Sequence, residues 1–343
     1  MKEFLVIPRA SASVLFAGWL VLSVASFAQE KPPSAEEAAR RIFAGDEPRS
    51  LAELQAMDRL QQTLARQAIV STVEVQVRAA HGSGVAILSP NGENEGYILT
   101  AGHVAGKPGR DAVVTLANGG KLPGKTLGVY RSLDVALVKV EPSRSLPPRK
   151  LAVVKNIPQG MWCMAVGHPG GYQTGRPPVV RVGRVLLNDG LAITTDCTLV
   201  GGDSGGPLFG MNGEVIGVNS RIGRSLSANI HSPVQACLGA WDRLVQGDAW
   251  GRFPGVRPYI GVRGASADKT ARVAGVDVNT PAEKAGLKAG DVILRFDGKK
   301  IENFDALVEE VLATLPGERV VVEVLREDRR IKMNLMVGNR ENS

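Results

Sequence analysis

Residues 201–207 read Gly-Gly-Asp-Ser-Gly-Gly-Pro, and this stretch decides how the rest of the chain is interpreted. A serine hydroxyl is a weak nucleophile, and it needs a tight backbone around it whose amides point at one place. Glycine permits such turns because it has no Cβ. The stretch therefore predicts Ser204 as a nucleophile, with an oxyanion hole built from the amides of Gly202, Asp203 and Ser204.

Two other segments supply the partners that such a serine needs. The run Thr100-Ala101-Gly102-His103-Val104 places His103 beside a glycine turn, after an apolar stretch. The run 133–140 (LDVALVKV) places Asp134 at the head of an apolar strand. The histidine would take the serine proton and the carboxylate would fix its tautomer. Either residue alone could be ordinary, but the order His103, Asp134, Ser204 is the chymotrypsin-like one.

The region from residue 72 to about 219 predicts a mostly β domain. Val73, Val75 and Val77 alternate with polar residues, which is typical of a strand. Short apolar runs punctuated by Gly, Pro and Asn follow, at 85–88, 97–100, 112–116, 135–140, 162–166, 179–187, 191–195 and 215–219. This pattern favours an antiparallel barrel or sandwich. A helix is expected over 233–246, and 247–258 reads as a linker because it is rich in Gly, Pro and Arg.

The first 28 residues resemble a secretory signal. Lys2 and Arg9 precede an apolar run that ends in Ser26-Phe27-Ala28, where small residues occupy the positions that a signal peptidase reads. We expect cleavage after Ala28 and export to the periplasm or the cell exterior. The alternative is a retained membrane anchor, for which 11–28 is only just long enough. No later segment is apolar enough to cross a membrane.

Residues 29–67 form a predicted N-terminal helical extension. Ser34 with Glu37, and Ser50 with Glu53, fit the capping-box pattern. After the second box, apolar residues recur every three or four positions, at Leu51, Leu54, Met57, Leu60 and Leu64. Such a stripe docks either on its own domain or on a neighbouring subunit.

The composition argues against several other functions. The formal net charge is +7, but the charges are scattered and not interleaved with aromatics, so no nucleic-acid surface is expected. The three cysteines, Cys163, Cys197 and Cys237, have neither C-x-x-C spacing nor a histidine at metal-like spacing, so no metal or cofactor is predicted. They allow at most one disulfide, and buried free thiols are favoured.

The last part of the chain, 256–339, predicts a small α+β domain. Thr280-Pro281-Ala282-Glu283 is a capping box with proline at the first helical position, and Gly286 can end the short helix. A second helix is expected over 304–315. Strands are expected over 292–296, 320–325 and 331–337, the last two as a hairpin.

Three segments closely resemble the signature segments of trypsin-like peptidases: TAGHV, SLDVALVKV and GGDSGGPL. The turn at 165–170 and the C-terminal module make the chain similar to the HtrA/Deg family. Tyr259-Ile260-Gly261-Val262 resembles the carboxylate-binding loop of a PDZ domain, and 279–297 is very similar to the PDZ segment of these proteases. The resemblance covers roughly residues 68–338.

The resemblance implies two six-stranded β-barrels over 68–247, with the active site between them, a linker at 248–255 and a PDZ domain over 256–339. It implies a serine endopeptidase that cleaves unfolded or damaged proteins in the cell envelope and binds C-terminal peptides through Tyr259–Val262. A homo-trimer or higher oligomer is expected. Thr198 would lie near the base of the primary specificity pocket. Because Thr198 is not acidic, a small or aliphatic residue is expected before the scissile bond.

One position departs from the family pattern. The residue before the nucleophile is Asp203 where the family usually has Asn, and no activation sequence precedes Val73 to supply a new amino terminus as its partner. Asp203 therefore needs another partner, or water. Two rival functions remain: a catalytically weak chaperone or peptide-binding scaffold on the same fold, and an esterase that uses the same triad.

Overall fold

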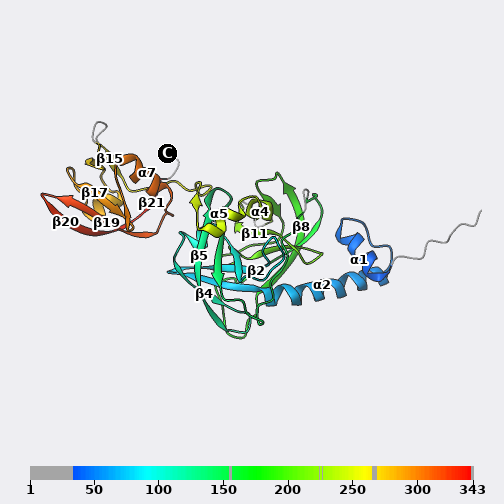
Figure 1. Ribbon diagram of the computed structural model, residues 1–343. Coiled ribbons are helices and arrows are strands. Elements are labelled where there is room, and N and C mark those ends of the chain that lie inside the picture. Colours follow the sequence, from blue (N-terminus) through cyan, green and yellow to red (C-terminus); the bar gives the residue numbers. More distant parts are fainter. Residues whose placement is uncertain (1–33, 154–156, 224, 226, 265–268, 341–343) are drawn as a thin grey trace, which may run out of the picture.

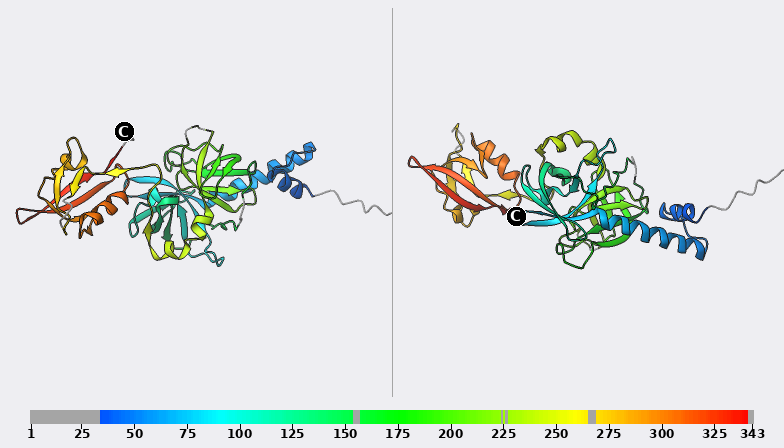
Figure 2. Two further views of the ribbon diagram at one scale, coloured as in Figure 1. Left: turned by 90° about the horizontal axis from the view of Figure 1, so that it is seen from above. Right: turned by 60° about the horizontal axis from the view of Figure 1, so that its bottom comes forward.

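The computed structural model describes residues 34–153, 157–223, 225, 227–264 and 269–340, so the predicted signal segment lies outside the described residues. A pair of helices projects from one side of a central double β-barrel, and a smaller α+β unit lies on the opposite side (Figure 1). The two views of Figure 2 show the same row of three parts.

The first barrel forms where the sequence alternates between apolar and polar residues. Its strands are β1 (Thr72–Val77), β2 (Ala80–Ile87), β3 (Tyr97–Thr100), β4 (Asp111–Thr115), β5 (Lys121–Tyr130) and β6 (Val135–Val140). They lie in the order β5-β4-β1-β2-β3-β6, and the pairing of β5 with β6 closes the barrel. All these pairs are antiparallel.

The second barrel repeats this architecture. Its strands are β7 (Trp162–Gly167), β8 (Val179–Asn188), β9 (Ile193–Thr195), β10 (Pro207–Gly210), β11 (Val215–Arg221) and β12 (Asn229–Pro233). They close in the order β10-β11-β12-β9-β8-β7. The predicted mostly β fold of two six-stranded barrels is therefore confirmed.

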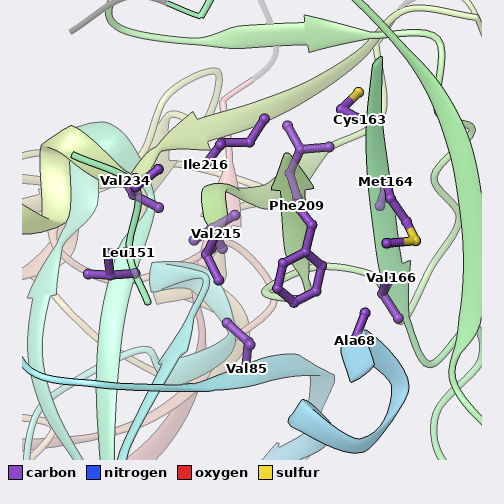
Figure 3. Packing of buried hydrophobic residues seen from close by; sticks show 14 of the residues in the cluster. Ala68, Val85, Leu151, Cys163, Met164, Val166, Phe209, Val215, Ile216 and Val234 are labelled. Atoms are coloured by element: carbon purple, nitrogen blue, oxygen red, sulfur yellow. The ribbon is translucent and has the colours of Figure 1, made fainter. Parts of the chain in front are cut away.

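One hydrophobic core joins both barrels and the N-terminal helix. Phe209 of β10 is fully buried, and Figure 3 shows its ring among side chains of the second barrel, with Val85 of β2 and Ala68 of the preceding helix nearby. Burying a phenylalanine contributes about 1.5–3 kcal/mol relative to leaving it exposed. The shared core fixes the barrels against each other, which any site between them requires.

The N-terminal extension is a helical hairpin of α1 (Ala35–Phe43) and α2 (Leu51–Ser71). Both predicted caps are present: the hydroxyls of Ser34 and Ser50 accept hydrogen bonds from the amides of Glu37 and Glu53. Phe43 lies edge-on to Trp162 of the second barrel, with ring centroids 6.4 Å apart.

The apolar stripe of α2 only partly docks on its own domain. Leu64 is buried, and Met57 and Leu60 pack against the shared core. Leu51 and Leu54 remain 71% and 46% exposed. The far end of the helix therefore presents an apolar face that its own barrels leave uncovered.

The segment that follows the second barrel differs from the prediction in two ways. The expected helix over 233–246 is two short helices, α4 (Val234–Leu238) and α5 (Trp241–Gln246). Part of the predicted linker is a strand, β13 (Ala249–Trp250), which pairs in parallel with β5. The ring of Trp250 stacks on Tyr130 at 4.6 Å, and this aromatic contact holds the segment on the first barrel.

The C-terminal unit has the predicted mixture of strands and helices. Its elements are β14 (Pro258–Tyr259), β15 (Val262–Gly264), β16 (Val273–Val276), α6 (Pro281–Ala285), β17 (Val292–Phe296), β18 (Lys299–Lys300), α7 (Phe304–Leu312), β19 (Arg319–Arg326), β20 (Arg329–Met336) and β21 (Gly338–Asn339). The hydroxyl of Thr280 caps α6 and Gly286 ends it in the left-handed conformation, as predicted. The expected final hairpin is β19–β20.

Ion pairs join the C-terminal unit to the first barrel. Lys107 Nζ lies 3.0 Å from Asp297 Oδ2, and Arg110 pairs with both Asp297 and Glu318. Phe253 is buried in a small cluster with residues of the first barrel, against which Leu315 packs. These contacts hold the C-terminal unit beside the region where His103 lies.

All three cysteines are buried and free, as favoured from the sequence. The sulfurs of Cys163 and Cys197 are 3.9 Å apart, and burial raises the pKa of the Cys237 thiol to about 12. Among the described residues, no cluster of side chains could hold a metal ion, and no helix has the length and apolar character to cross a membrane.

Candidate active site

His103 lies in the short helix α3 (Gly102–Ala105), directly after β3. The preceding Gly102 packs tightly, since a Cβ there would lie 3.3 Å from Asp134 Oδ1 and 3.2 Å from the Phe253 ring. This close packing brings the backbone of the His103 turn against the carboxylate of Asp134.

Asp134 is held at the centre of a hydrogen-bond network. It is buried, in the left-handed conformation with φ 51°, at the end of a 3₁₀ turn (Arg131–Leu133). Its carboxylate accepts hydrogen bonds from the amide of His103 at 2.9 Å and from Ser220 Oγ at 2.6 Å. His103 Nδ1 lies 2.9 Å from Oδ2 and 3.0 Å from Oδ1. The carboxylate is therefore positioned to fix the orientation of the imidazole.

The environment of His103 shifts its pKa upward. Burial acts to lower the pKa, but the charge of Asp134 and its hydrogen bond raise it by more in sum. A base needs its neutral form, so the shift makes His103 a stronger base that is available only at higher pH.

Ser204 lies in the loop before β10, and its carbonyl accepts a hydrogen bond from the amide of Ser83 at 2.7 Å. Its hydroxyl donates to the carbonyl of Ser220 at 3.4 Å, and among the described residues no hydrogen bond joins it to His103. Ser204, His103 and Asp134 nevertheless line one cavity of about 620 Å³, the active-site cavity. The structure thus brings the three predicted residues together, while their catalytic roles stay predictions.

The loop around Ser204 has the shape that an oxyanion hole needs. Gly202 has φ 98°, and a Cβ there would lie 2.4 Å from the carbonyl oxygen of His168, so only glycine fits. Within the described residues, the amides of Gly202 and Ser204 have no intramolecular partner, but the amide of Asp203 donates to Val200 O at 3.1 Å. Of the three predicted oxyanion donors, the amides of Gly202 and Ser204 therefore stay candidates, because the amide of Asp203 already donates a hydrogen bond within the loop.

The side chain of Asp203 has a partner that sequence reasoning did not identify. Its Oδ2 lies 3.1 Å from Nη1 of Arg181, on β8, and accepts a hydrogen bond from the amide of Val200 at 2.9 Å. Burial raises the pKa of Asp203 by more than the Val200 amide and the nearby arginines lower it. Nothing in the sequence around Arg181 marks it, because the pair joins a residue of β8 to a loop residue that is distant in sequence.

Thr198, predicted to lie near the base of the primary specificity pocket, is found on the loop before Ser204. It is exposed and is not among the residues that line the active-site cavity. The residues that line this cavity include Leu199, Val200, Arg221 and Ile222. The role of Thr198 in a specificity pocket therefore stays a prediction.

Residues from outside the two barrels complete the active-site cavity. Phe253 and Pro254 come from the linker, and Leu315, Pro316 and Asn339 come from the C-terminal unit. Ser220 was also missed from the sequence. Its signal is a small polar residue at the end of the buried run 215–219, but only the fold places it against Asp134.

A second cavity, the C-terminal groove, lies beside the predicted peptide-binding residues. Tyr259, Ile260, Gly261 and Val262 line it on one side, and α7 lines the other with Phe304, Leu307, Val308, Val311 and Leu312. Its volume is about 460 Å³. Gly261 has φ 84°, and a Cβ there would lie 2.3 Å from Thr280 Cβ. In the described part of the chain, the amides of Ile260 and Gly261 have no intramolecular partner.

Comparison with known proteins gives two family matches. A trypsin-like peptidase domain matches residues 82–218, and a PDZ domain matches residues 258–337. A probable periplasmic serine endoprotease DegP-like of Pseudomonas fulva (strain 12-X) is 34% identical over 277 residues, which cover 75% of this chain and 55% of that protein. One of Halomonas elongata is 31% identical over 278 residues, covering 76% and 57%.

The chain thus spans about half the length of the curated relatives it matches. Among solved structures, the serine endoprotease from Yersinia pestis is 24% identical, with 86% of this chain and all of that chain covered, at a TM-score of 0.47.

The two family matches follow one another in the order predicted from the sequence, and each falls on one folded part of the chain. Each of the two sequence relatives matches about three quarters of the chain. The chain therefore belongs to the HtrA/DegP-like family of trypsin-like serine proteases that carry a C-terminal PDZ domain.

Proposed function

We propose that the chain is a serine endopeptidase in which Ser204 attacks the peptide carbonyl, His103 is the base and Asp134 orients His103. The observation that carries the proposal is the network in which the Asp134 carboxylate accepts hydrogen bonds from His103 and Ser220, in the cavity that Ser204 also lines. The family match over 82–218 supports it.

The reaction follows from this geometry. Substrate binding would turn the Ser204 hydroxyl from the Ser220 carbonyl towards His103, which takes its proton as the new bond forms. Catalytic hydrogen bonds are often absent or long before substrate binds. The amides of Gly202 and Ser204 would stabilise the negative charge on the tetrahedral intermediate. The C–N bond then breaks as His103 returns the proton to the leaving amine. Water next attacks the acyl-Ser204 ester, with His103 again taking a proton, and the serine hydroxyl is regenerated.

The cavity lining favours small or aliphatic side chains before the scissile bond. Leu199, Val200 and Ile222 offer apolar surface, and the last two are 39% and 49% exposed. Among the described residues that line the cavity, the acid is Asp134, which already contacts His103. This lining suits cleavage of many unfolded sequences rather than selection of basic residues.

We assign the C-terminal groove to extended C-terminal peptides. A terminal carboxylate would accept hydrogen bonds from the amides of Ile260 and Gly261, and the peptide would add to the edge of β15. The side chains of α7 would hold the apolar last residue of the peptide.

We also propose that the mature protein is an oligomer, with a trimer favoured, that acts outside the cytoplasm. Leu51 and Leu54 form the apolar face on α2 that the chain's own barrels leave uncovered. Contiguous exposed apolar surface of this kind usually marks a contact. The relatives' names place those proteins in the periplasm, which agrees with the predicted signal segment.

The nucleophile is tested by Ser204→Ala, which should lower turnover of an unfolded protein by about six orders of magnitude, because no other group supplies the attacking oxygen. Wild-type protein should take up a fluorophosphonate label at Ser204, located by mass spectrometry. A variant that still cleaves at the wild-type rate would contradict the assignment. Wild type that suppresses aggregation but cleaves nothing would favour the chaperone scaffold.

The dependence of kcat/KM on pH tests the role of His103. His103 must be neutral to act as a base, and its pKa is raised, so activity should rise with pH through a midpoint above the usual value of about 6.5. Burial lowers the pKa of His168 to about 4 and of His231 to about 3, so neither accounts for this limb. The matched control is His81→Gln, on the rim of the first barrel, which should leave the midpoint unchanged. A midpoint well below 6.5 would refute the assignment.

Carboxylate capture is tested with peptides that end in an apolar residue, using full-length Ser204→Ala protein and fluorescence anisotropy. Amidation of the peptide C-terminus should weaken binding by about tenfold or more, since a charged hydrogen-bond acceptor is lost. Val308→Glu, in the groove, should also weaken binding. Val321→Glu, at a similarly exposed valine of β19 outside the groove, should not. Equal affinity for free and amidated peptides would exclude carboxylate capture.

The oligomer is tested by light scattering on Ser204→Ala protein. Replacing Leu51 and Leu54 by Asp should convert the oligomer to a monomer, because the charges would be buried without partners in the contact. Replacing Leu187, exposed on β8, by Asp should not. A wild type that is already monomeric at micromolar concentration would rule out the oligomer.

A further inference from the structure

We propose that Arg181 is a positioning residue for the reaction: by neutralising the buried carboxylate of Asp203, it holds the loop 200–204 in the shape that presents the oxyanion-binding amides. The inference rests on the proposed peptidase function. It concerns an ion pair that joins β8 to the residue beside the nucleophile.

The carboxylate of Asp203 lies where an unpaired charge is very costly. Its side chain is fully buried, and its Oδ1 has no hydrogen-bond partner among the described residues. The backbone of Gly167 packs directly against this oxygen, since a Cβ at Gly167 would lie 2.5 Å from Asp203 Oδ1. An ionised carboxylate survives such burial only beside a compensating cation.

Arg181 provides that cation from a rigid position. Its backbone lies opposite Ala165 of β7 in the register of the closed second barrel, and its side chain is 19% exposed. The contact is an ion pair rather than an aligned hydrogen bond, because the Nη1 group near Oδ2 meets no hydrogen-bond criterion. The other nearby cation, Arg176, donates its hydrogen bonds to other groups, since its Nη2 binds the carbonyls of Pro169 and Gly171.

The Asp203 side chain determines the shape of the oxyanion loop. Its Oδ2 accepts from the amide of Val200, while the amide of Asp203 donates to the carbonyl of Val200. These two hydrogen bonds close a small ring that contains Gly202, one of the two proposed oxyanion donors. If the carboxylate left its pocket for water, this ring would open, and the peptide between residues 201 and 202, which carries the Gly202 amide, would be free to rotate.

This account makes a charge-balance prediction. Arg181→Gln leaves the buried carboxylate uncompensated, so kcat for an unfolded-protein substrate should fall by about 10²-fold, as when an oxyanion donor is lost, with KM within about threefold. The double variant Arg181→Gln, Asp203→Asn buries no charge. Its amide oxygen can still accept from Val200, so kcat should return to within about tenfold of wild type. Arg181→Lys, which keeps the charge, should retain most activity.

The matched control is Arg184→Gln, three residues along β8. The Arg184 guanidinium lies over the Trp162 ring, 4.3 Å from its centroid, and donates to Gly160 O, so it does not contact the oxyanion loop. This variant should keep the wild-type kcat. Near-ultraviolet circular dichroism of each variant reports whether the barrels remain packed.

The outcomes separate this inference from the proposed function. Wild type that neither cleaves nor takes up a fluorophosphonate label defeats the function itself. Active wild type with an equally active Arg181→Gln variant defeats only the inference. If Arg181→Gln does not fold, the double variant decides: rescue of folding and turnover upholds charge compensation, and a double variant that is inactive or unfolded overturns it.

Discussion

The carboxylate of Asp134 accepts hydrogen bonds from both barrels, and the candidate active site depends on this one group. His103 and Asp134 come from the first barrel, while Ser220 comes from β11 of the second, and all three are joined through this one buried group. The site exists only while the barrels keep their relative position. That position depends on the shared core around Phe209, to which α2 and β2 also contribute.

A second buried carboxylate, that of Asp203, is stabilised mainly by a nearby positive charge, whereas Asp134 is stabilised mainly by hydrogen bonds. Asp134 accepts hydrogen bonds from several donors. In the described part of the chain, Asp203 contacts one amide and one arginine, and its second carboxylate oxygen has no partner. The buried charge beside the nucleophile is stabilised by position in the fold more than by hydrogen bonds. An asparagine in place of Asp203 would bring no such charge, so the proposed role of Arg181 depends on the aspartate of this chain.

Local signals were sufficient for much of the fold and for the three candidate catalytic residues. Capping boxes located the starts of α1, α2 and α6, and alternation located the strands, because both patterns arise from short-range geometry. Ser220 and Arg181 show the limit of such local signals. Which side chains face a cavity, and which partner a buried charge finds, depends on strands that are distant in sequence. The strand β13 escaped prediction for the same reason, since it exists only through its pairing with β5.

The anchoring of this segment also limits how far the PDZ domain can lie from the first barrel. The chain is held on that barrel as far as Phe253, which is buried against it, and the PDZ fold begins at Pro258, so the free tether is the segment 254–257. Fully extended, at roughly 3.3–3.6 Å a residue, it reaches about 14 Å. A polypeptide held in the C-terminal groove therefore stays near the catalytic cavity at an effective concentration on the order of millimolar. In the proposed peptidase, this tether would turn weak capture of a chain end into repeated local encounters of the same polypeptide with Ser204.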